Sequence, residues 1–253
     1  MRPILLLCFL LLPCCAMAAL SPAALRDVRL ELPGGARLPL DLTAKDLSGK
    51  SLTLRTALAG ERGFVVLADY TCKHLCGPAL VLLGTAIAQS GLSPTQHRLI
   101  VIGLDPKDTA DDARRMAAAQ LPESVRARAV FLLPDARNIS AMTKALGFRY
   151  AYDAAIDQFA HPEVVYSIKS DGHVAQLLSP LTMSAADISH AFSDPPQSPG
   201  TLYERFRVLC YRFGQLSGAY TATVELLLKI SSVLTLAAMA GGLILMRKRR
   251  GTA

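Results

Sequence analysis

The sequence predicts an α/β fold in which buried strands alternate with helices. Three short apolar runs bounded by turn residues, at 63–69, 98–104 and 129–133, have the length and composition of buried strands. Each run is followed by a segment with helical character, at 79–88, 110–119 and 139–146. In open α/β sheets the functional residues lie at the carboxyl ends of the strands. The residues that follow each predicted strand are therefore the first candidates for a functional site.

The remaining predicted elements complete the plan of a thioredoxin-like domain with an added hairpin. A polar-interrupted hairpin with its turn at 48–50 is expected before the first buried strand. Gly147 is expected to end the third helix, and residues 150–162 are expected to form a loop. Strands at 164–168 and 174–178 then form an antiparallel hairpin around the turn 170–172. A last helix at 184–192 begins with Ser184 as N-cap and Asp187 as its capping partner.

Both ends of the chain carry segments that stand apart from this domain. Residues 1–18 have a basic Arg2, an apolar run and the small residues 16–18, which is the pattern of a signal peptide. A lipid-attachment site at Cys14 or Cys15 is the competing interpretation of that segment. Residues 225–246 are apolar except near their start, where Lys229 can snorkel, and four basic residues follow at once. This segment is predicted to be a transmembrane helix.

The predicted organisation is a signal peptide at 1–18, a thioredoxin-like domain at 19–193 and a proline-rich spacer with a juxtamembrane segment at 194–224. A membrane helix at 225–246 and a basic tail at 247–253 follow. Basic residues after the helix predict a cytoplasmic tail and a periplasmic domain on a bacterial inner membrane. Of the net charge of +7, one positive charge lies in the signal and four in the tail, which leaves about +2 on the exported part. A nucleic-acid partner is therefore not expected.

Two cysteines directly follow the first buried strand. Cys72 and Cys76 lie at a strand-to-helix junction, where unpaired amides and the helix dipole favour a thiolate over a thiol. Their i, i+4 spacing predicts that both sulfurs lie on one side of a helical turn, close enough to share a metal ion or to form a disulfide. A purely structural disulfide is the simpler alternative. Cys210, the third cysteine after the signal, is expected to be an apolar membrane-proximal residue.

A histidine that precedes a strand is a candidate third ligand. Two thiolates suit Cu(I), whose low coordination number leaves room for one imidazole. His161 stands beside Pro162, just before the predicted strand 164–168, whereas the other four histidines fall in turns or on exposed helix ends. His161 can reach the sulfurs if that strand lies beside the cysteine strand. Otherwise it is an ordinary surface histidine.

Several of these motifs together resemble the Sco/SenC family. They are Thr71 with Cys72 and Cys76, the run GLDPKDT at 103–109, and a histidine loop before the hairpin sequence YSIKSDGHV at 166–174. The resemblance covers residues 44–192. It implies a membrane-tethered, thioredoxin-fold metallochaperone that supplies copper, as Cu(I) or Cu(II), to the copper-site subunit of cytochrome c oxidase or another periplasmic copper protein. It also implies that Cys72, Cys76 and His161 bind the copper, and that Asp105 and Pro106 shape the fold.

The sequence departs from the family pattern around the cysteines. Lys73 follows Cys72 directly, and Gly77 separates Cys76 from Pro78, where the family usually has proline after each cysteine. Positive charge between two cysteines also favours disulfide exchange. The alternative function is therefore a thiol-disulfide oxidoreductase that reduces the cysteines of a copper-receiving partner and is recharged by a thioredoxin-like reductant. His161 is essential to the metallochaperone hypothesis only.

Overall fold

The computed structural model describes residues 20–193 and 221–250 of the chain. The chain divides into two units, residues 1–211 and 212–253, and each is described by itself. The first contains the sheet and its helices, and the second contains helix α8 (Thr221–Arg250). The predicted signal peptide 1–18, most of the predicted spacer, Cys210 and the last three residues lie outside the described residues. The predictions made for those segments stay predictions.

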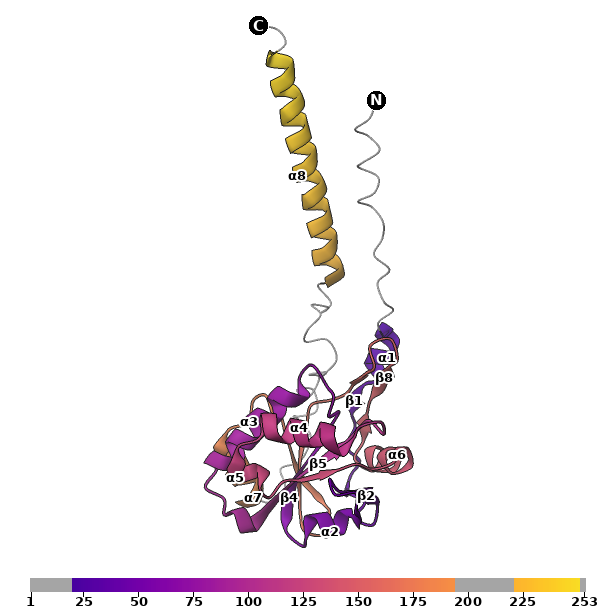
Figure 1. Ribbon diagram of the computed structural model, residues 1–253, viewed down its shortest axis with the longest axis vertical. Coiled ribbons are helices and arrows are strands. Elements are labelled where there is room, and N and C mark those ends of the chain that lie inside the picture. Colours follow the sequence, from indigo (N-terminus) through magenta and orange to yellow (C-terminus); the bar gives the residue numbers. More distant parts are fainter. Residues whose placement is uncertain (1–19, 194–220, 251–253) are drawn as a thin grey trace. The chain divides into compact units, whose positions relative to one another are not determined.

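A five-stranded sheet forms the centre of the first unit (Figure 1). Its strands β4 (Arg62–Ala68), β5 (His97–Gly103) and β6 (Val130–Leu132) are parallel. Strands β10 (Val165–Ile168) and β11 (Val174–Leu178) form an antiparallel hairpin, and β10 pairs antiparallel with β4. The order across the sheet is β11-β10-β4-β5-β6. The predicted α/β fold with an added hairpin is therefore confirmed, and every predicted buried strand is present.

Helices cover both faces of this sheet because its central strands are apolar on both sides. Along β4, Phe64 and Val66 pack in one core cluster, and Val65 and Leu67 in the other. Such alternation follows from the two-residue period of a strand. Residues of α3 (Cys76–Gln89), α4 (Ala110–Gln120), α5 (Glu123–Arg126) and α7 (Ala185–Ser193) join the first cluster. Residues of α2 (Leu54–Leu58) and α6 (Ala136–Ala145) join the second.

Short elements surround the sheet. The predicted first hairpin is confirmed as β2 (Thr43–Lys45) and β3 (Ser51–Thr53), and its turn is held by Asp46, whose carboxylate accepts bonds from the amides of Ser48 and Lys50. Helix α1 (Pro22–Asp27), the 3-10 turn η2 (Pro94–Gln96) and the pairing of β1 (Arg29–Leu30) with β7 (Phe148–Arg149) were not predicted. Elements of this length carry too few residues to show a period.

The loop predicted at 150–162 is wrong in its middle part. Strands β8 (Ala151–Asp153) and β9 (Gln158–Ala160) form an antiparallel hairpin there. Aromatic contacts across the pair stabilise it, since the ring of Phe159 lies 5.0 Å from that of Tyr152 and 5.8 Å from that of Tyr150. The hairpin depends on contacts between its strands, which a reading of local pattern does not register.

Helix α8 covers the segment 225–246 that was predicted to span a membrane. A helix at this place is confirmed. Within the part of the chain that the structure describes, no helix has both the length and the apolar character needed to cross a membrane. The membrane-spanning part of the prediction is therefore without structural support.

Gly147, the predicted helix end, is a site where only glycine fits. Its φ is +62°, and a Cβ there would overlap the carbonyl oxygen of Glu31. The amide of Glu31, just after β1, donates to the carbonyl of Gly147 and so holds the two segments together. We expect Gly147→Ala to reduce the free energy of unfolding by about 3 kcal/mol or more, because it adds a backbone clash to the strain of a positive φ. Urea denaturation measures this.

Gly91→Ala is the matched control for this substitution. Gly91 also has a positive φ, +73°, but nothing lies within 4 Å of the position that a Cβ would occupy there. We expect a loss of about 1 kcal/mol at this residue, from backbone strain alone. Equal losses in the two variants would contradict the close approach of β1 to the turn after α6.

Candidate metal centre

Helix α3 begins at Cys76, three residues earlier than predicted. Leu75 already has helical dihedral angles, and its carbonyl accepts a bond of 2.8 Å from the amide of Ala79. No side chain caps this helix end. The sulfur of Cys76 therefore lies at the first residue of a helix, where the dipole and the unbonded amides stabilise negative charge. The side chain is only 2% exposed.

Cys72 lies in the turn before the helix rather than in it. Its amide donates to the carbonyl of Asp69 at 3.1 Å, and its sulfur accepts a bond of 3.4 Å from the amide of His74. The expectation that Cys72 and Cys76 share one side of a helical turn is therefore wrong, because the helix starts only at the second cysteine. Cys72 is half-buried and packs against the first core cluster. No disulfide joins these two cysteines.

The antiparallel pairing of β10 with β4 brings His161 to the cysteine turn. In that register Val165 lies opposite Val66, so the start of β10 adjoins the end of β4. His161 stands four residues before Val165 and is fully buried. Its Nε2 lies 3.4 Å from the Sγ of Cys76, across 85 residues of sequence. The strand after His161 thus lies beside the cysteine strand, and His161 reaches the sulfur of Cys76 as expected.

The other nitrogen of His161 determines which tautomer is present. Nδ1 lies 3.1 Å from the carbonyl oxygen of Pro162, which can only accept a hydrogen bond. Nδ1 therefore carries the proton, and in the neutral ring the lone pair of Nε2 faces the sulfur of Cys76. A histidine that donates through one nitrogen and offers the other is oriented as metal-binding histidines are.

Glu163 is a member of this cluster that sequence reasoning missed. Its side chain is 3% exposed, and its Oε1 lies 3.8 Å from Nε2 of His161. One donor atom each from Cys76, His161 and Glu163 lies within 4.8 Å of the other two, and Cys72 does not join this group. The available signal was the His-Pro-Glu sequence, because residues i and i+2 of an extended segment face the same side.

The carboxylates of buried Asp69, after β4, and half-buried Asp108, after β5, hold the cysteine turn in place. Asp69 Oδ1 accepts bonds of 2.9 Å from the amide and the hydroxyl of Thr71, and Asp108 Oδ2 accepts one of 2.8 Å from the amide of Tyr70. Burial raises the pKa of Asp69 above its ordinary value, and burial raises the pKa of Asp108 to about 7. Asp105 accepts from the amide of Lys107, which agrees with a structural role.

The β8–β9 hairpin closes the other side of the cysteine turn. Gln158 on β9 is buried, and its Oε1 accepts a bond of 3.3 Å from the amide of Lys73. Near the tip of the hairpin, Asp157 binds the ammonium group of Lys107 and accepts a bond of 2.6 Å from the hydroxyl of Tyr152. The hairpin that precedes His161 is thereby tied to the cysteine turn and to the loop after β5.

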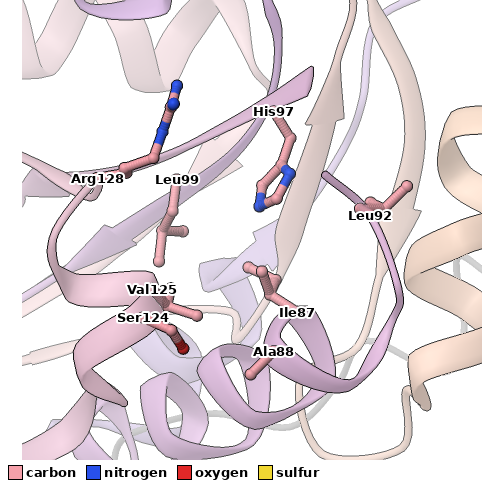
Figure 2. Close-up of a pocket in the computed structure, with 8 residues that line it drawn as sticks. All are labelled: Ile87, Ala88, Leu92, His97, Leu99, Ser124, Val125 and Arg128. Carbon is pink, nitrogen blue, oxygen red and sulfur yellow. The ribbon is translucent and has the colours of Figure 1, made fainter. Parts of the chain in front are cut away.

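A cavity of about 90 Å³ lies elsewhere in the domain, against the end of α3 (Figure 2). Figure 2 shows the ring of His97 directed toward Ile87, while the guanidinium group of Arg128 points away from the other lining residues. Burial lowers the pKa of His97, and its Nδ1 bonds to the carbonyl of Ser93. Neither cysteine of the turn lines this cavity. This cavity is therefore separate from the candidate metal centre.

The fold and this cluster define a thioredoxin-like domain with a sulfur–nitrogen–oxygen donor site at its cysteine turn. Neither a family model nor a curated protein matches the sequence. Among solved structures, Bradyrhizobium japonicum ScoI with copper bound is similar, with a TM-score of 0.52, 16% identity and coverage of 63% of this chain and 97% of that one. Arabidopsis thaliana ScoI with copper bound is also similar, with a TM-score of 0.52 and 15% identity. The match covers 62% of this chain and 94% of that one.

BsSco, a member of the Sco family of cytochrome c oxidase assembly proteins, gives a TM-score of 0.53, 19% identity and coverage of 65% and 96%. It was solved in a study of a disulfide switch. At these identities the likeness concerns the fold. The domain thus has the fold of the Sco/SenC proteins, which confirms at the structural level the resemblance found in the sequence motifs.

The raised pKa of Asp108 predicts a pH-dependent stability. Between its unfolded value near 3.8 and its folded value of about 7, the native state binds more protons than the unfolded state, so the free energy of unfolding falls as the pH rises. We expect Asp108→Asn to lose the pH dependence that comes from this carboxyl group. Above pH 7 the variant is expected to be more stable than the wild type, because it has no charged carboxylate at this half-buried position. Urea denaturation from pH 4 to 8 measures the difference. Exposed Asp41 provides the control variant D41N, and identical pH profiles for D108N and the wild type would refute the assignment.

Proposed function

We propose that this protein is a Sco-type copper-binding protein that uses Cys72, Cys76 and His161 to hold copper for assembly of a cytochrome c oxidase copper site. The observation that carries the proposal is the 3.4 Å approach of Nε2 of His161 to the sulfur of Cys76 in a buried site, while Nδ1 faces the carbonyl of Pro162. Two solved structures with the same fold contain bound copper. Thiolate and imidazole are also the donors that Cu(I) prefers.

Cys72 has to turn toward the cluster for all three residues to hold one ion. Its sulfur now contacts the amide of His74, in the segment of bends before α3. A side-chain rotation there breaks the bond between this sulfur and the amide of His74. Cys72 is also the more exposed of the two cysteines, so it is the sulfur that a partner's ligand reaches first. In the proposal, copper leaves by ligand exchange. A ligand of the partner first replaces Cys72, and then Cys76 and His161.

A second candidate function is favoured by the unequal burial of the two cysteines. The half-buried Cys72 is placed to attack a partner's disulfide as a thiolate, which forms a mixed disulfide and releases one partner thiolate. Cys76, at the helix start, then attacks the Cys72 sulfur and releases the second partner thiol. A disulfide between Cys72 and Cys76 remains, and a thioredoxin-like dithiol reductant has to reduce it for the next cycle. The disulfide switch of BsSco is a redox precedent on the same fold.

Substitutions at the three residues separate these functions. We expect Cys72→Ser and Cys76→Ser each to lose tight Cu(I) binding, and His161→Ala to weaken it at least about tenfold because one donor is lost. An anaerobic competition titration with a chromophoric Cu(I) chelator measures the affinities, and Cys210→Ser is the matched control. Reduction of a protein disulfide is expected to require both cysteines and to be nearly unchanged in H161A.

Two results of that titration would contradict the copper-binding proposal. One is the absence of a near-stoichiometric Cu(I) site in the wild type together with rapid disulfide reduction, which would establish the second function. The other is an unchanged Cu(I) affinity in H161A, because the proposal depends on the imidazole.

The two end segments of the sequence indicate where the protein is located in the cell. We infer export by residues 1–18 and attachment to the membrane through 225–246, with the copper site on the periplasmic side. The full chain is then expected to stay with membranes after alkaline carbonate extraction, and a chain ending at residue 224 to be released. A chain that lacks only 247–253 is the control. Release of the full chain by carbonate would refute the membrane attachment.

A further inference from the structure

The donor atoms of Cys76, His161 and Glu163 have the separations of ligands around one metal ion. With bond lengths of about 2.3 Å to sulfur and about 2.0–2.2 Å to nitrogen or oxygen, tetrahedral donors lie roughly 3.3–3.6 Å apart. The sulfur of Cys76 is 3.4 Å from Nε2 of His161, and Oε1 of Glu163 is 3.8 Å from the same nitrogen. The third separation, between that sulfur and the carboxylate oxygen, is at most 4.8 Å.

The same distances exclude a nucleophilic triad made from these three residues. In a Cys-His-Glu triad the carboxylate orients the imidazole through one ring nitrogen while the thiol bonds to the other. Here both the sulfur and the carboxylate face Nε2, and Nδ1 is occupied by the carbonyl of Pro162. Donors that converge on one side of the ring suit a shared cation, not a proton relay through the ring.

We propose that Glu163 is a metal ligand, and that with Cys76 and His161 it makes this site a binding site for a divalent first-row ion. The inference rests on the metal site proposed above, but it does not depend on copper delivery. The local chain explains why the carboxylate and the imidazole face the same side. Pro162 holds the segment extended, so that the side chains before and after it face the same side.

Charge balance explains why this carboxylate selects the divalent state. All three side chains are at most 3% exposed, and an uncompensated charge is costly at such depth. A divalent ion is neutralised by one thiolate and one carboxylate. A monovalent ion bound by the same thiolate and carboxylate leaves one uncompensated negative charge in the buried site. Carboxylate oxygen is also a harder donor than sulfur, and the mixed set of sulfur, nitrogen and oxygen is one that Zn²⁺ and Cu²⁺ accept.

The experiment compares divalent and monovalent affinities in the purified full-length protein. Zn²⁺ and Co²⁺ are the divalent probes because they do not oxidise thiols, and Co²⁺ reports its thiolate ligand by charge-transfer absorption. We expect Glu163→Gln to bind Zn²⁺ and Co²⁺ at least about tenfold more weakly than the wild type, while its Cu(I) affinity stays within about threefold. Glu123→Gln, at an exposed carboxylate on α5, is the matched control and is expected to match the wild type.

A measurement on the wild type keeps the test independent of how E163Q folds. In protein labelled with ¹³C-glutamate, one carboxyl resonance is expected to shift when one equivalent of Zn²⁺ is added. Equal Zn²⁺ affinity in E163Q and the wild type, or no shifted carboxyl resonance, overturns the assignment of Glu163 as a ligand. If instead the wild type lacks a tight Cu(I) site but its Zn²⁺ affinity depends on Glu163, the copper proposal fails and the divalent site stands.

Discussion

The pairing of β10 with β4 is the constraint on which the site depends. Both strands lie inside the sheet and are buried on both faces, so a shift of one residue would move Val165, Tyr166 and Ile168 each into the opposite core cluster. Burial of strand β10 therefore determines the register, and the register places His161 at the turn after β4. A histidine 85 residues from Cys76 along the chain thus comes into contact with it for reasons that have nothing to do with metal.

The neighbourhood of the site combines a turn whose backbone amides are bonded to side chains with one half-buried cysteine. Asp69, Asp108 and Gln158 hold backbone amides of the cysteine turn. Cys76, His161 and Glu163 are buried, and at such depth a charge costs stability unless an opposite charge compensates it. Cys72 alone retains contact with solvent. Such an arrangement fits a site that gains stability from an ion and exchanges it at one edge.

Local sequence pattern was sufficient to predict the elements that have a clear apolar run, cap or turn. The apolar runs of β4, β5 and β6, the capping pair Ser184 and Asp187, and the hairpin β10–β11 are all found where their residues predict them. The β8–β9 hairpin was missed because its stability comes from aromatic contacts between strands. The start of α3 was misplaced, since glycine and proline at 77 and 78 suggested a turn but occupy the first turn of the helix, where proline loses no bond.

The sequence by itself determined the α/β class, the position of the cysteine pair after a buried strand, and a short choice of histidines, because these depend on periodicity and residue type. Only the tertiary structure decided that His161 meets Cys76, that Cys72 stands outside the immediate cluster, and that Glu163 stands inside it. The physical reason is that distances between remote residues follow from strand register and burial. Those quantities come from the packing of the whole domain, and no segment of the chain contains them alone.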